Sequence, residues 1–165
     1  KEMMFFIRHT GPAMSAFNAW LLSKSLETLP LRMDRHCANA LAVAEALEKS
    51  EEVEIVRYPH LKSHPQYELA KKQMKQGGGI VTFVVKGGFE RAKRFLDALQ
   101  MFLITSNLGD SRSIATHPAS TTHSKLTVEE RAQIGIFPGS VRLSIGLENI
   151  EDIIGDITNA LEKSK

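Results

Sequence analysis

Cysteine is almost absent from this sequence, because Cys37 is the only one among 165 residues. A single cysteine cannot form an internal disulfide or a zinc cluster, so we expect a reducing compartment, the cytoplasm. Neither charge is in large excess, since 21 lysines and arginines stand against 19 aspartates and glutamates. This balance argues against a dedicated nucleic-acid-binding protein and against one that binds anionic membranes. No apolar run approaches the roughly 20 residues that a bilayer-spanning helix needs.

The rest of the composition is that of an ordinary globular domain, with 42% hydrophobic and 24% charged residues. The length suits one domain with a well-formed core, and the sequence has no internal repeat or low-complexity segment. Collagen-like, coiled-coil and disordered chains are thereby excluded. The start, Lys1-Glu2-Met3-Met4, resembles neither a signal peptide nor a natural first segment, so we expect a piece of a longer protein.

Hydrophobic periodicity predicts short strands that are mostly separated by helices. The expected helices are 14–24, 30–49, one starting near 63, 89–100, a short one from 127 and a final one after 149. The expected strands are 53–56, 80–86, 101–105 and 141–145, with an irregular stretch at 106–126. Segment 1–9 fits either a strand or a helix end, and a turn is expected at 10–12. The order predicts an α/β fold, an α+β sandwich in which a small, largely antiparallel or mixed sheet has helices mostly on one face.

Local signals mark two helix starts and one core position. Thr127 and Glu130 have the spacing of a capping box. Asn149 precedes two acidic residues in the way typical of a helix N-cap. Cys37 falls on an apolar helical stripe, so we expect it in the core and not as a nucleophile.

Arg142 is the first candidate for a binding residue. In its alternating strand, Val141, Leu143 and Ile145 point one way, and Arg142 and Ser144 point the other way. A planar guanidinium on that second face is well suited to hold a carboxylate through two parallel hydrogen bonds. The alternative is a surface arginine at an edge of the sheet, and periodicity by itself favours that alternative.

The stretch after residue 105 is rich in small polar residues, and Gly109 allows unusual backbone conformations there. Segment 106–113 has the composition of a pocket loop for an anionic substrate, although composition alone favours a plain connection. His117 and His123 lack a third ligand with convincing spacing, so we expect no metal and regard them as structural. Gly77–Gly79 follow a helix and precede a strand, which is the reverse of the order in a phosphate-binding loop.

Three stretches carry a resemblance to a known family. They are TGPAMSAFNAWLLSKSLETLPLRMDRHCANA (10–40), SNLGDSRSIATHPASTTH (106–123) and GSVRLSIGLENIEDI (139–153). Together they resemble the C-terminal part of the Cys/Met-metabolism enzymes that depend on pyridoxal 5′-phosphate, in family order and over nearly the whole chain. This resemblance implies the C-terminal domain of a fold-type I enzyme. Within the family, segment 106–123 is most like O-succinylhomoserine sulfhydrylase, while Ser25 departs from the glycine that many members have.

The resemblance also implies residue roles. Arg142 would hold the α-carboxylate of the substrate, with Ser106 beside the same carboxylate and Asn107 as its neighbour. Arg112 and Thr122 would lie in the segment that faces the active site. The family's Ser-x-Thr-Lys motif occurs nowhere in this sequence. The Schiff-base lysine and the cofactor-binding residues are therefore expected in a large domain upstream, with 1–29 as an interdomain helical segment and 30–165 as the small C-terminal domain.

The implied reaction of the full-length enzyme is a γ-replacement in methionine biosynthesis by the trans-sulfuration family. A transferase of this kind would make homocysteine from O-succinylhomoserine and sulfide, as a homo-oligomer, a tetramer. The present piece is expected to be inactive by itself. Cystathionine γ-synthase and O-acetylhomoserine sulfhydrylase are alternatives inside the family, and a non-catalytic carboxylate-binding module is an alternative outside it.

Overall fold

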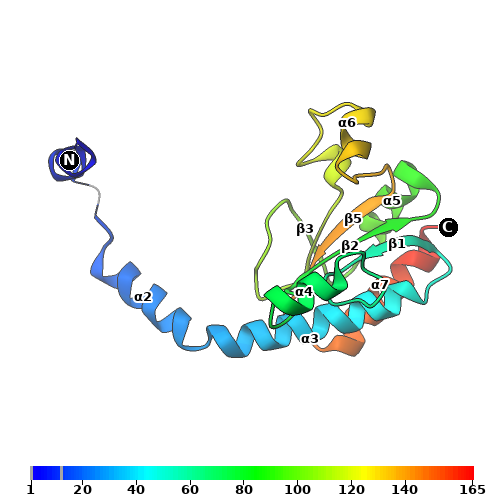
Figure 1. Cartoon of the computed structure of the whole chain (residues 1–165), viewed down its shortest axis with the longest axis horizontal. Coiled ribbons are helices and arrows are strands. Elements are labelled where there is room, and N and C mark those ends of the chain that lie inside the picture. Colours follow the sequence, from blue (N-terminus) through cyan, green and yellow to red (C-terminus); the bar gives the residue numbers. More distant parts are fainter. Residues whose placement is uncertain (1, 12) are drawn as a thin grey trace. The chain divides into compact units, whose positions relative to one another are not determined.

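The computed structural model describes residues 2–11 and 13–165, so Pro12 of the expected turn lies outside the described residues (Figure 1). The chain divides into two compact units, Lys1–Leu31 and Arg32–Lys165. Among the described residues, no helix is both long and apolar enough to cross a membrane.

The described residues of the first unit lie mainly in helices, and none of them is buried. It contains α1 (Glu2–Thr10) and α2 (Ala16–Glu27), and α3 (Leu29–Glu48) begins within it. Residues 2–9 are thus helical, while Lys1 of that segment lies outside the described residues. The helix expected at 14–24 is confirmed with slightly later bounds. Ser15 begins α2, since its hydroxyl accepts a hydrogen bond from the Asn18 amide at 3.2 Å. No residue of α1 or α2 is buried, although both helices are rich in large apolar side chains.

The second unit is built on a five-stranded sheet. Its strands are β1 (Val53–Arg57), β2 (Ile80–Val85), β3 (Leu103–Ile104), β4 (Ile114–Thr116) and β5 (Ser140–Ser144). Their order across the sheet is β1-β2-β5-β4-β3, and only the β3–β4 pair is parallel. The small, largely antiparallel mixed sheet expected from the sequence is therefore confirmed.

One face of the sheet packs against three helices, α3, α5 (Gly88–Ala98) and α7 (Ile150–Lys163). The strand residues that take part in this core are Val81, Phe83, Val85, Ala115, Val141 and Leu143. Phe83 meets Phe95 of α5 edge to face, with ring centroids 5.4 Å apart. Cys37 is buried in α3, as expected. The expectation that helices cover mostly one face is confirmed.

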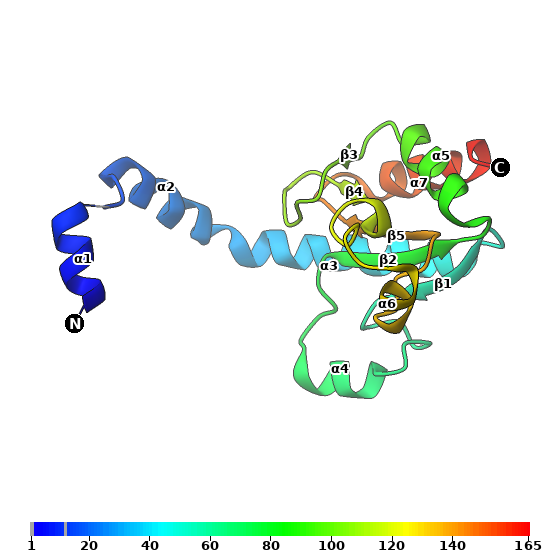
Figure 2. The ribbon, with the colours of Figure 1, turned by 90° about the horizontal axis from the view of Figure 1, so that it is seen from above.

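The remaining elements lie outside this core. Figure 2 shows α4 (Tyr67–Gln73) standing away from the strands. Helix α6 (Val128–Gln133) begins with the capping box expected at Thr127 and Glu130. Helix α7 begins at the expected cap, because the Asn149 side chain accepts a hydrogen bond from the Glu151 amide at 2.9 Å.

The stretch 106–126 was expected to be irregular, and this expectation is wrong in part. It contains β4 and a 3-10 turn, η1 (Pro118–Ser120). Strand β4 has only three residues, and all three are buried because it lies between β5 and β3. A strand that is short and buried on both faces shows no alternation of polar and apolar residues, so periodicity gives no signal for it.

Candidate functional site

Arg142 lies on the central strand of the sheet, on the face that the three core helices leave uncovered. Its neighbours Val141 and Leu143 point into the core and are fully buried. Across the sheet, Arg142 is paired with Thr82 of β2 and with Thr116 of β4. The alternative of a surface arginine at a sheet edge is therefore wrong, because strands flank β5 on both sides.

The Arg142 guanidinium is held by main-chain oxygen atoms of the loop that follows β3. Its Nη2 donates to the carbonyl oxygen of Ser106 at 2.8 Å and to that of Asn107 at 3.2 Å. Its Nε is buried and has no hydrogen-bond partner among the described residues. A buried N–H group without a partner costs roughly 1–3 kcal/mol, so an oxygen acceptor bound there is favoured.

Segment 106–113 is shaped by a turn and fixed to β5. Gly109 has a φ of +80°, in the left-handed region that favours glycine, and its amide donates to Ser144 Oγ at 2.9 Å. Asp110 accepts hydrogen bonds from the Arg112 amide at 3.0 Å and from Arg112 Nη2 at 3.1 Å. The hydrogen bonds from the Arg112 side chain, followed by that from its amide, lower the pKa of Asp110 to about 2.

This loop borders a cavity of about 580 Å³. Its lining residues are Leu103, Thr105, Ser106, Asn107, Leu108, Gly109, Asp110, Arg112 and Ile114. The structure thus brings Ser106 and Asn107 together with Arg142, and it places Arg112 on the cavity wall. Thr122 lies elsewhere, on an exposed turn where its hydroxyl is 2.8 Å from His123 Nδ1.

The two histidines of this region make hydrogen bonds through their rings. His117 is buried, with Nδ1 2.9 Å from Ser120 Oγ and Nε2 2.8 Å from the Pro138 carbonyl oxygen. Both ring nitrogens are thus engaged, and the structural role expected for His117 is confirmed. Within the described part of the chain, no group of three or more His, Cys, Asp or Glu side chains could hold a metal ion.

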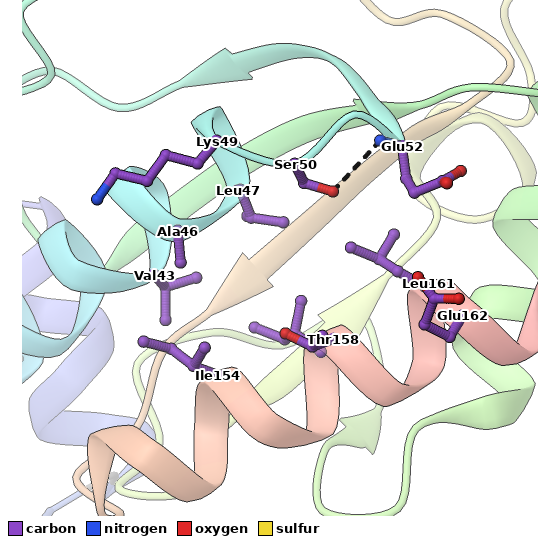
Figure 3. A pocket seen from close by; sticks show the side chains of 11 residues that line it. Val43, Ala46, Leu47, Lys49, Ser50, Glu52, Ile154, Thr158, Leu161 and Glu162 are labelled. Carbon is purple, nitrogen blue, oxygen red and sulfur yellow. Dashed lines mark hydrogen bonds between the residues drawn. The ribbon is translucent and has the colours of Figure 1, made fainter.

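A second cavity, of about 240 Å³, lies between α3 and α7 (Figure 3). Aliphatic side chains form most of its wall, among them Val43, Leu47, Ile154 and Leu161. The carboxylate at one end, Glu52, is already paired with Arg91 and Lys165. The cavity lined by segment 106–113 is the better candidate for an anionic ligand, because Arg112 lies on its wall and Arg142 contacts the same loop, whereas the wall of the second cavity is mostly aliphatic.

The comparisons with known proteins decide the family. The family model described as Cys/Met metabolism PLP-dependent enzyme matches residues 1–162. The chain belongs to this family. The resemblance seen in the three sequence stretches is therefore confirmed.

The family's curated members include several similar proteins. The chain is 52% identical over 158 residues to O-acetyl-L-homoserine sulfhydrylase from Leptospira meyeri, covering 94% of this chain and 36% of that protein. It is 48% identical over 161 residues to O-succinylhomoserine sulfhydrylase from Pseudomonas aeruginosa, covering 98% of this chain and 40% of that protein. It is 52% identical over 155 residues to L-methionine gamma-lyase from Pseudomonas putida, covering 94% of this chain and 39% of that protein. The chain thus spans about two fifths of the length of these relatives.

A solved structure of the family has the same fold. It is a putative O-acetylhomoserine (thiol)-lyase from Campylobacter jejuni that contains a pyridoxyl-lysine phosphate group. The TM-score is 0.88 at 42% sequence identity, and the match covers 96% of this chain and 38% of that chain. The expected fold, part of a fold-type I enzyme, agrees with this likeness.

The residues around Arg142 suit a carboxylate group but not the family's cofactor. The cavity wall offers hydroxyl, amide and guanidinium groups, which suit a carboxylate. It includes no lysine to bind the cofactor's aldehyde and no aromatic ring to stack on a pyridine. No cofactor-dependent step is therefore assigned to the described residues of this family member.

Some contacts of the site were not predicted from the sequence. The alternation of the strand placed Ser144 on the face of Arg142, but nothing local indicated that its hydroxyl accepts from the Gly109 amide. Thr82 and Thr116 flank Arg142 only through the pairing of strands, which a single sequence does not specify.

Proposed function

We propose that this chain is the substrate-carboxylate-binding part of a PLP-dependent sulfhydrylase. The whole enzyme makes homocysteine from O-succinylhomoserine and sulfide by γ-replacement, as a transferase of methionine biosynthesis. The observation that carries the proposal is Arg142 on the central strand, which has a buried, unpartnered Nε and is held by the carbonyl oxygens of a loop that lines an open cavity. The names of the relatives support the sulfhydrylase class.

Arg142 binds the α-carboxylate of the amino-acid substrate in this proposal. The carbonyl oxygens of Ser106 and Asn107 hold Nη2, so the plane of the guanidinium is set before the substrate arrives. A carboxylate that accepts from Nε satisfies the unpartnered donor and fixes the direction of the amino acid. The Ser106 hydroxyl lies beside the same carboxylate, and the Asn107 side chain is its neighbour. A displacement of about 1 Å at such a contact can cost on the order of 100-fold in rate.

The remaining parts of the enzyme lie outside this chain in the proposal. A large upstream domain carries the Schiff-base lysine and binds pyridoxal 5′-phosphate, which supplies the electron sink for chemistry at the amino acid. Residues 1–29 connect that domain to the small domain, 30–165, and the small domain alone is inactive. The full-length enzyme is a homotetramer in the cytoplasm, and its ligands are small molecules and not nucleic acids or membranes.

O-acetylhomoserine sulfhydrylase is the second candidate. It is supported by the 52% identity to the Leptospira meyeri protein, while the O-succinylhomoserine sulfhydrylases from Mycobacterium tuberculosis and Pseudomonas aeruginosa are 51% and 48% identical to this chain. Cystathionine γ-synthase differs from both in taking cysteine as the sulfur donor. Initial rates of the full-length enzyme with succinyl and acetyl esters, each with sulfide and with cysteine, separate the three.

The carboxylate assignment is tested in the full-length enzyme by replacing Arg142 with alanine. We expect KM for the homoserine ester to rise by about 100-fold, because a charge-assisted pair is lost. An unchanged KM would refute the assignment. A full-length protein that binds amino acids through Arg142 but turns over none of them would support the non-catalytic module instead.

A further inference from the structure

Ser113 anchors the loop that contacts Arg142. It is fully buried at the end of segment 106–113, next to β4. Its amide donates to Glu148 Oε1 at 2.6 Å, and its hydroxyl donates to Glu148 Oε2 at 2.9 Å. The same hydroxyl accepts from the Gly146 amide at 2.9 Å. One serine is therefore joined by three hydrogen bonds to the segment that follows β5.

Glu148 is placed for this contact by a neighbouring helix. Asn39 of α3 donates from Nδ2 to the carbonyl oxygens of Gly146 and Glu148, both at 3.0 Å. These hydrogen bonds fix the main chain of residues 146–148, which carries the Glu148 side chain. Both carboxylate oxygens then accept from Ser113, and such charge-assisted hydrogen bonds are about twice as strong as neutral ones.

The loop also lies directly against the main chain of Gly146. A Cβ atom at this position would be 2.6 Å from the carbonyl oxygen of Ser111, which is too close for any side chain. The same carbonyl oxygen accepts from the Leu147 amide at 2.8 Å. Together with the bond from the Gly109 amide to Ser144 Oγ, these contacts fix the loop to residues 144–148.

Arg142 stands two residues before that anchoring segment, and it is held by the other end of the same loop. The carbonyl oxygens of Ser106 and Asn107 can meet Nη2 only if the loop lies close to β5. The position of the guanidinium thus depends on contacts that Arg142 itself does not make.

We infer that Glu148 is a positioning residue, which holds segment 106–113 through Ser113 so that the loop carbonyls orient Arg142 for a substrate carboxylate. This inference rests on the proposed function of Arg142. In this inference, Glu148 does not contact the substrate. Its effect is on the affinity for the amino acid, and not on the chemical step.

The test uses the full-length enzyme with Glu148→Gln, which keeps the size of the side chain but removes its charge and one acceptor. We expect KM for the homoserine ester to rise about fivefold, with kcat within about twofold and KM for the sulfur donor unchanged. Ser144→Ala removes the acceptor for the Gly109 amide and should raise the same KM. If Glu148→Gln does not fold, this variant tests whether fixing the loop orients Arg142, and an unchanged KM would then overturn the inference. The matched control is Glu52→Gln, which changes a half-buried carboxylate that pairs with Arg91 and Lys165 and does not contact the loop, so it should leave KM unchanged.

A double-mutant cycle separates positioning from a general loss of stability. If Glu148 acts through Arg142, Glu148→Gln has no further effect on KM in an Arg142→Ala enzyme. Equal and additive effects in both backgrounds would overturn the inference. So would an unchanged KM in Glu148→Gln when Arg142→Ala alone raises KM. If Arg142→Ala itself leaves KM unchanged, it is the proposed function that fails.

Discussion

Arg142 Nη2 lies 2.8 Å from the carbonyl oxygen of Ser106, a residue 36 positions earlier in the chain. The two meet because β5 is the central strand and β4, its neighbour, leads back to the loop that carries Ser106. A cation on a sheet face is thereby joined to the polar segment 106–113, which forms a wall of the candidate site.

Replacing Arg142 with lysine should not restore the site. A lysine ammonium has no planar fork and cannot both donate to the loop carbonyls and bind a carboxylate side by side. We expect KM for the amino-acid substrate of the full-length enzyme to rise at least about tenfold, measured by steady-state rates. Arg112→Lys, in the same loop but exposed, is the matched control and should change KM less. Equal effects of the two substitutions would contradict this role for the fork.

The Asp110–Arg112 pair should persist into acid. Because Arg112 lowers the pKa of Asp110 from 3.8 to about 2, the contribution of the pair to stability is fully present above pH 3.8. It is lost as the pH falls through about 2. Carboxyl NMR shifts should show this titration near pH 2, and Arg112→Ala should move it towards 3.8. A titration at 3.8 in the unmodified chain would disprove the pairing.

Alkali should act on the fold through Tyr58. Burial raises the pKa of the Tyr58 phenol above its usual value of 10, and its hydroxyl donates to the carbonyl oxygens of Cys37 and Gly78. The folded state therefore holds this proton more tightly than the unfolded state does. The resulting stabilisation is complete below pH 10 and declines as the pH rises through the higher folded pKa.

The ultraviolet absorbance of phenolate, followed together with circular dichroism, checks the role of Tyr58. We expect the Tyr58 signal to appear only as the fold is lost. Tyr58→Phe should abolish that part of the absorbance change. Ionisation of Tyr58 in a chain with intact circular dichroism would show that the phenol is not held as described.

The core between β2 and α5 should be the part of the second unit most sensitive to truncation. Phe95 is fully buried and meets Phe83 edge to face, so Phe95→Ala leaves a cavity and should reduce the free energy of unfolding by about 3–5 kcal/mol. Urea unfolding measures this change. Ile104→Ala, at an exposed position of β3, should stay within about 0.5 kcal/mol. A loss below about 1 kcal/mol for Phe95→Ala would contradict the packing.

Much of the fold follows from short-range patterns in the sequence. The alternation in 141–145 predicted which side chains of β5 face the helices, and the spacing of Thr127 and Glu130 predicted a helix start that the structure confirms. Strand β4 was not predicted, because its three residues are all buried and their sequence shows no alternation of polar and apolar residues.

The site was predictable only in part, because its contacts are remote in sequence. Periodicity placed Arg142 on the second face of its strand but favoured a sheet edge, and only the strand order put it at the centre. Ser106 and Asn107 entered through resemblance to a family. Ser113 and Glu148 are 35 residues apart, and nothing local in one sequence indicates that they meet.

The Arg142 guanidinium is held by main-chain carbonyl oxygens, which are present whatever the side chain at those positions. The side chains at positions 106 and 107 can therefore change in evolution without loosening the guanidinium. Under the proposed function, the loop side chains can differ between enzymes that use different leaving groups or sulfur donors, while the same carbonyl oxygens still orient Arg142.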